Sequence, residues 1–166
     1  MRPIKNPFRS LEGYHCFGCS PSNQAGLRLT FVEDGEEIIS RWNPERHFQG
    51  YMNVLHGGIQ ATLMDEIASW TVYVKVKTYG VTSRASIKYR KPVFVDKGAL
   101  LLRSKVLSVR KNLADIEVKL FDSGSQLCAE GILTFFTFSE EKSREGGLYY
   151  PGPDAFFEKT AGKNET

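Results

Sequence analysis

The alternation of apolar and polar residues predicts one long apolar helix near the middle of the chain. From Ile59 to Val74, apolar residues occupy almost every side of a helical wheel, which is typical of a helix surrounded by protein. Glycine is disfavoured inside helices but suits an entrance where the backbone approaches another group, so we place the helix start at Gly57 or Gly58. The last residues of this stretch, 72–77, alternate with period 2, which also fits a strand, but no turn signal separates them from the helix. We therefore predict a helix that continues to about Lys77.

Period-2 patterns predict strands on both sides of this helix. A hairpin precedes it, with strands over 27–33 and 37–42, and four longer strands follow it, over 81–89, 99–110, 114–122 and 127–138. A hairpin, one apolar helix and long strands joined by short turns indicate an α+β fold in which an antiparallel sheet curls around the helix. We expect residues 1–26 to be an irregular segment and 27–138 to be the folded domain. Residues 139–166 should form a tail whose aromatic side chains dock on the body or on a neighbouring subunit.

Composition and charge narrow the class of protein. The 166 residues favour a single domain, and 41% hydrophobic with 25% charged residues is typical of soluble globular proteins. The net charge of +3 is too small and too scattered to indicate nucleic-acid binding, but it is compatible with an anionic ligand. No apolar run approaches the ~18 residues of a membrane span, and the N-terminus lacks the apolar core of a signal peptide. We expect a cytoplasmic protein that enters no membrane.

The pair Cys16 and Cys19 forms a CxxC motif, so zinc or redox chemistry has to be weighed. A structural zinc site normally has four ligands. No second paired spacing supplies the others among the remaining candidates, which are His15, His47, His56 and Cys128. An odd number of cysteines also fits reduced thiols better than a disulfide framework. We interpret the pair as part of a packed turn and expect no metal.

Two adjacent acids, Asp65 and Glu66, interrupt the apolar helix. Neighbours on a helix point about 100° apart, so the two carboxylates cannot face the same place. A buried carboxylate has a raised pKa, which suits a general base or a nucleophile. The alternative is an acid at the edge of the helix that forms a structural ion pair with Arg or Lys. Periodicity alone leaves both interpretations open.

Three short motifs resemble the signature of the hotdog-fold thioesterases, in particular the PaaI-like and Them-type acyl-CoA thioesterases. They are Phe48-Gln49-Gly50, His56-Gly57-Gly58 and Leu63-Met64-Asp65-Glu66, and the resemblance extends from about Cys16 to Phe138. It implies the hotdog fold and an acyl-CoA substrate, with no cofactor other than the coenzyme A that the substrate carries. It also implies that Asp65, nine residues after His56, is the catalytic carboxylate. A Ser or Thr on the next strand would position the water, and Thr82 is the matching residue, with Ser83 as its nearest competitor.

Thioester hydrolysis also needs a group that polarises the carbonyl. The N-terminus of a helix offers unpaired N–H groups and a partial positive charge, and the glycines allow close approach, so the N–H of Gly57 or Gly58 is our candidate. Asp65 lies eight residues after Gly57, ~12 Å along the axis. The two groups must therefore come from different chains. We predict a two-fold dimer, or a dimer of dimers, in which Asp65 of one chain meets Gly57 of the other.

The remaining candidates have supporting roles. We expect His56 to orient the loop or the first turn rather than to act as a base. Several relatives of the resembled family carry an Asn six residues before this histidine; here Gly50 holds that position, and Asn53 is the nearby candidate for a substrate contact. Arg84 belongs to a basic stretch that either meets the phosphates of coenzyme A or forms a solvated face.

We therefore predict an acyl-CoA thioesterase with Asp65, Gly57, His56 and Thr82 at the catalytic centre and Gly58, Asn53, Ser83 and Arg84 as substrate-binding residues. Two alternatives remain open. One is a hotdog dehydratase or hydratase of 3-hydroxyacyl thioesters, which would pair a histidine with the acid in a different local motif. The other is a module that binds acyl thioesters without turnover, because a fold does not fix a function.

Overall fold

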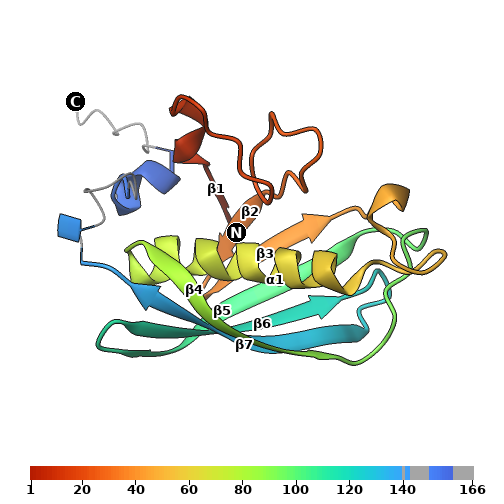
Figure 1. The fold of residues 1–166 in the computed structure, drawn as a ribbon. Coiled ribbons are helices and arrows are strands. Elements are labelled where there is room, and N and C mark those ends of the chain that lie inside the picture. The colour runs from red at the N-terminus through yellow and green to blue at the C-terminus, as the bar shows by residue number, and fades with distance from the viewer. Residues whose placement is uncertain (140, 143–149, 159–166) are drawn as a thin grey trace, which may run out of the picture.

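The computed structural model describes residues 1–139, 141–142 and 150–158, and in this part seven strands form one antiparallel sheet around a long helix (Figure 1). The strand order is β1-β2-β3-β5-β6-β7-β4, so β1 and β4 are the two edges. The strands are β1 (Arg2–Ile4), β2 (Phe31–Asp34), β3 (Glu37–Trp42), β4 (Gly80–Tyr89), β5 (Leu100–Arg110), β6 (Leu113–Phe121) and β7 (Leu127–Thr137). This arrangement confirms the predicted α+β architecture and the hotdog fold.

The central helix α1 (Gly57–Thr71) starts where the glycines predict and continues as a π-helical segment, Val72–Val76. It ends at Lys77, whose φ of 59° is left-handed. The inner face of α1 is fully buried against the sheet, in a core that includes Leu63, Met64, Ile67, Leu102, Ile116, Val118 and Leu133. Burying each of these side chains stabilises the fold by ~1.5–3 kcal/mol, so helix and sheet depend on each other. No described helix is long and apolar enough to cross a lipid bilayer.

The N-terminal 26 residues are more ordered than the sequence predicted. Strand β1 pairs with β2, and a 3₁₀ helix, Pro7–Ser10, follows under an Asn6 cap. The three residues of β1 are too few to show a period-2 pattern in the sequence. Pro3 also argues against a strand, although an edge strand accepts proline. The predicted strand over 27–33 was also wrong at its start. The N–H groups of Leu27 and Leu29 donate to the carbonyls of Phe17 and Gly18, so these two residues are buried outside the sheet.

The described part of the C-terminal tail docks on the body, as expected. Tyr150 and Phe156 are buried, and Phe156 stacks on Tyr73, with ring centroids 5.7 Å apart. A 3₁₀ helix, Pro153–Phe156, carries this contact. The same aromatic cluster includes Phe8 from the N-terminal segment, so this segment and the described part of the tail both pack on α1 beside Trp70. Tyr149, another aromatic residue of this tail, lies outside the described residues.

Candidate functional site

His56 caps the entrance of α1. Its Nδ1 accepts a hydrogen bond from the N–H of Gly58 at 2.9 Å, which satisfies one of the free amides of the first turn. A Cβ atom on residue 58 would lie 3.0 Å from this nitrogen, so glycine fits the cap better than any larger residue. No described residue accepts a hydrogen bond from the N–H of Gly57. Of the two candidate donors, Gly57 is therefore the one with an amide available to a ligand.

A cavity of about 450 Å³ opens at this entrance and is lined by Gly57, Gln60 and Tyr89, among others. The Tyr89 hydroxyl donates to the carbonyl of Gly57 at 3.0 Å. Gln60 is buried; its Nε2 donates to the carbonyl of Leu55, whereas its Oε1 has no partner among the described residues. Neither Gln60 nor Tyr89 was predicted from the sequence. The signal for Gln60 was present, since a polar side chain in the first turn of an otherwise apolar helix needs an explanation.

Asp65 is half-buried on α1 and faces the edge strand β4. The Thr82 hydroxyl donates to Asp65 Oδ1 at 2.6 Å. Burial raises the pKa of Asp65 above its ordinary value, and the hydrogen bond from Thr82 opposes this shift. Within the described residues no cation pairs with this carboxylate. The geometry thus favours a chemical role over the structural ion pair that the sequence left open.

A β-bulge decides which hydroxyl of β4 reaches the acid. The register between β4 and β7 shifts between Thr82 and Arg84, so Ser83 is the extra residue. The Ser83 hydroxyl donates to the carbonyl of Thr134 at 3.0 Å and is used by the bulge itself. The structure therefore brings Thr82, and not Ser83, to Asp65.

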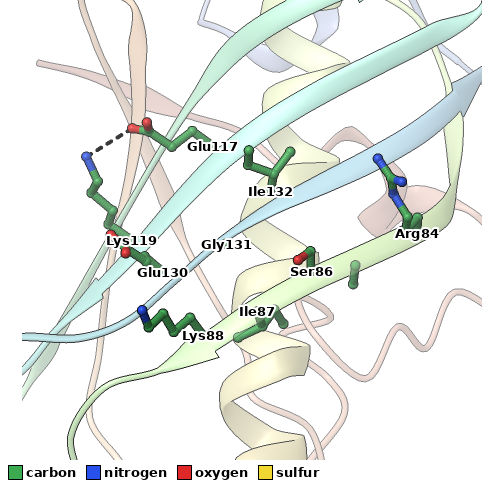
Figure 2. A pocket seen from close by; sticks show the side chains of 10 residues that line it. Arg84, Ser86, Ile87, Lys88, Glu117, Lys119, Glu130, Gly131 and Ile132 are labelled. Carbon is green, nitrogen blue, oxygen red and sulfur yellow. Dashed lines mark ion pairs between the residues drawn. The ribbon is translucent and has the colours of Figure 1, made fainter.

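Arg84 lies on the other face of the sheet. It lines a cavity of about 730 Å³ over β4, β6 and β7, together with Lys88, Glu117 and Ile132 (Figure 2). The residues next to Glu117 and Ile132 in the sequence are Ile116, Val118 and Leu133, and they are buried against α1. Because side chains alternate along a strand, the cavity lies on the face of the sheet opposite Asp65. Within one chain, Arg84 is not part of the Asp65 site.

Asn53 also lies apart from the proposed centre. It is a turn residue with a left-handed φ of 62°, and its N–H donates to Gln49 Oε1. Its side chain lines a separate cavity with Asp96 rather than the cavity at Gly57. The structure also explains Gly50, because a Cβ there would lie 3.0 Å from the ring of His56 and press on the helix cap.

Glu66 points away from Asp65, as its position on the helix requires. Trp70 Nε1 donates to Glu66 Oε1 at 3.1 Å, and Cys16 Sγ lies 3.7 Å from the same oxygen. Burial raises the pKa of Glu66 to about 7. A hydrogen bond from the Cys19 thiol lowers the pKa of Cys16 to about 5. Glu66 therefore belongs to a second polar cluster, separate from the Asp65 site.

Comparison with known proteins identifies the family of the chain. Residues 52–129 match the thioesterase superfamily model. A Saccharolobus solfataricus protein named "Putative esterase SSO1253" is 32% identical over 123 residues, which cover 73% of this chain and 79% of that protein.

Solved structures of similar fold include protein RHA08564, a thioesterase superfamily protein. Its TM-score is 0.66 at 20% identity, and the match covers 73% of this chain but only 62% of that one, less than two thirds. A hypothetical thioesterase protein from Streptococcus pneumoniae, solved with coenzyme A, has a TM-score of 0.62 at 19% identity. That match covers 67% of this chain and 86% of the Streptococcus protein. At these identities the two structures bear on the fold alone. The family match and the Saccharolobus relative show that the chain belongs to the thioesterase superfamily.

Proposed function

We propose that this protein hydrolyses the thioester bond of an acyl-CoA, with Asp65 as general base or nucleophile and the N–H of Gly57 as the group that polarises the carbonyl. The observation that carries the proposal is the half-buried Asp65 carboxylate, which is held by Thr82 and has no cation partner among the described residues. Burial raises the pKa of Asp65 and so makes its carboxylate a stronger base.

The chemistry can be written with Asp65 as the base. The carboxylate removes a proton from a water molecule, and the resulting hydroxide attacks the thioester carbonyl carbon. Negative charge then develops on the carbonyl oxygen, where the Gly57 N–H and the positive end of α1 stabilise it. The carbon–sulfur bond breaks, the departing thiolate takes up a proton, and a carboxylic acid remains. Because Thr82 occupies Asp65 Oδ1, the other carboxylate oxygen is left for the water. In the nucleophilic variant, the carboxylate itself attacks and water then hydrolyses the resulting anhydride.

The proposed site combines two subunits, because Asp65 and Gly57 of one chain are ~12 Å apart along the helix axis. The edge strand β4 contacts both ends of this span, since Thr82 binds Asp65 and Tyr89 binds Gly57. Nearly the whole of β4 is exposed and its outer backbone edge has no neighbouring strand among those described, which makes it a template for pairing.

Antiparallel pairing of two β4 strands would bring the separated groups together. If the two-fold axis passes between Ser86 and Ser86 of the partner subunit, and Ser83 remains the extra residue of the bulge, Thr82 lies directly opposite Tyr89 of the partner subunit. Residues in such opposed positions have Cβ atoms ~5 Å apart. The Asp65 carboxylate would then face Gly57 of the partner subunit, and the dimer would hold two equivalent sites. This pairing is the form of homodimer that we propose.

The direct test is the release of free thiol from a panel of short, long and aromatic acyl-CoA substrates. Replacement of Asp65 by Asn should lower turnover at least ~100-fold, the lower range for loss of a general base. Asp96→Asn is the matched control, because Asp96 is exposed and makes no hydrogen bond with a described residue. Glu66→Gln should also cost less than the Asp65 change. A loss for either Glu66→Gln or Asp96→Asn that equals the loss for Asp65→Asn would refute the choice of Asp65.

Two outcomes would replace thioester hydrolysis with another function. Loss of crotonyl-CoA absorbance without thiol release would indicate hydration of the acyl chain. Tight binding of acyl-CoA with no turnover of any kind would indicate a binding module.

A further inference from the structure

The N-terminal loop brings two thiols to Glu66, a residue that the proposed hydrolysis does not use. Cys16 Sγ lies 3.7 and 3.8 Å from the two carboxylate oxygens of Glu66. The two sulfurs and a carboxylate oxygen all lie within 4.8 Å of one another. All three cysteines of the chain are free thiols. Sequence spacing could not reveal this cluster, because Glu66 is 50 residues away from Cys16.

The spacing of one donor pair, Cys16 and Glu66, matches a tetrahedral metal site, and the other pairs lie within 4.8 Å. With Zn–S distances of ~2.3 Å and Zn–O distances of ~2.1 Å, a sulfur and an oxygen on the same ion lie ~3.6 Å apart, and two sulfurs lie ~3.8 Å apart. The distances from Cys16 Sγ to the Glu66 oxygens are close to the first of these values. An ion could therefore enter with small movements of the side chains. Two thiolates and a carboxylate are also ligand types that zinc accepts.

Further hydrogen bonds orient the donors as outer ligands of metal sites do. Trp70 Nε1 holds one oxygen of Glu66. The Tyr14 hydroxyl lies 2.9 Å from Cys19 Sγ and accepts a hydrogen bond from Asn6 Nδ2 at 2.9 Å, so its own proton is directed at the sulfur. A donor at this position stabilises a thiolate over a thiol. These contacts fix the positions of Glu66 and Cys19.

The backbone is shaped around the carboxylate as well. An ideal Cβ on Gly18, between the two cysteines, would lie 2.2 Å from Glu66 Oε2, so only glycine lets the carboxylate lie under the loop. The described side-chain partners of Glu66 are Cys16, Cys19 and Trp70, and none of them is a cation. A buried carboxylate beside two thiols requires compensation of its charge, either by protonation or by a positive ion.

A cavity of about 300 Å³ gives access to the cluster. It is lined by Cys16, Cys19 and Glu66, with Tyr14 and Tyr79 among its other walls. A metal ion could enter by this route, and a water molecule or a small ligand could take the fourth coordination position from it.

We propose that Cys16, Cys19 and Glu66 bind one thiophilic divalent cation of the zinc class, with a fourth position open to this cavity. The ion would tie the N-terminal loop to α1, on the helical turn that also carries Asp65. This proposal departs from the interpretation of the CxxC pair as a packed turn without metal, because the fold supplies a third donor that the spacing did not show.

The test is a zinc titration of the full-length protein, kept reduced and first stripped with a chelator, in competition with a chromophoric chelator. We expect one zinc ion per chain and a rise in Tm of several degrees when zinc is in excess. Cobalt in place of zinc should give the near-ultraviolet charge-transfer absorption of thiolate ligands. The double variant Cys16→Ser/Cys19→Ser should lose both signals, whereas Cys128→Ser, the matched thiol control, should keep them.

Glu66→Gln separates a metal site from a simple pair of thiols. It keeps the size of the side chain, so the variant should fold, and it should weaken zinc binding at least ~10-fold, the lower range for loss of a supporting group. Circular dichroism checks the fold of each variant, and Glu66→Gln decides the question if the double variant unfolds. The proposal is overturned if the reduced protein binds no zinc, if the double variant binds it as tightly as the original chain, or if Glu66→Gln leaves the affinity unchanged.

Discussion

Replacement of Gly57 by proline isolates the role of one backbone N–H. Gly57 is the first residue of α1, a position where proline is favoured because the missing N–H has no helical partner. His56 has φ of −58° and ψ of 135°, the extended conformation that a residue before proline adopts. A Cβ on residue 57 would meet its nearest atoms, in the Tyr89 ring, at 3.9 Å. The helix start should therefore accept the substitution.

The expected effect is a selective loss of transition-state stabilisation. The amide of Gly58 is committed to His56, so it cannot substitute for the lost donor. Removal of one donor to an oxyanion typically lowers kcat by ~10²–10³, equivalent to ~2.7–4 kcal/mol. Gly57→Ala is the matched control, because alanine keeps the N–H and its Cβ has room; its loss should be much smaller.

The assay is thiol release from an acyl-CoA, with kcat and KM measured for the original chain and both variants. Circular dichroism and Tm should show that each variant remains folded. We expect a large loss in kcat for the proline variant and a much smaller one for the alanine variant. If the proline variant keeps the kcat of the alanine variant, the N–H of Gly57 does not polarise the carbonyl.

Two further predictions concern pH. Hydrolysis requires ionised Asp65, so kcat should rise with pH through the pKa of Asp65. The hydrogen bond from Thr82 lowers this pKa, so Thr82→Val should move the rise to higher pH. Thr82→Ser keeps a hydroxyl and should leave the rise in place. The kcat–pH profile measures this, and an unmoved rise would argue against the contact. Glu66 has a folded-state pKa of about 7, above its ordinary value of 4.5, so its stabilisation is present at low pH and is lost as pH rises through about 7. In the reduced, chelator-stripped protein, the free energy of unfolding should fall over this range, and Glu66→Gln should reduce the fall. The same pH slope in both proteins, measured by denaturant unfolding, would contradict this prediction.

Much of the fold could be predicted because its signals are local. The apolar wheel from Ile59 to Val74 and the alternation after Val81 identify the helix and four strands to within about a residue. Strand β1 had no such signal, since its three residues gain their conformation only by pairing with β2. Leu27 and Leu29 show the opposite error: they alternate like a strand, but their amides bond to the N-terminal loop.

The candidate site could be predicted where its signal is also local in the sequence. Asp65 stood out as an acid in an apolar helix, and the structure adds its contact with Thr82. The preference for Gly57 over Gly58 depends on where the His56 ring nitrogen points, which no sequence pattern encodes. The cluster of Cys16, Cys19 and Glu66 depends on a loop folding back on the helix. In each case, the missing information is a contact between segments that are distant in the chain or a side-chain orientation.

Mixing two inactive variants tests the shared site most directly. A dimer that combines an Asp65→Asn chain with a Gly57→Pro chain would hold one site with both lesions and one intact site. If Asp65 of one subunit works with Gly57 of the other, a fully exchanged equal mixture should recover roughly a quarter of the original thiol-release activity, because about half of the dimers are mixed and each has one working site. Activity that stays at the level of the separate variants, although subunit exchange is complete, would contradict the account.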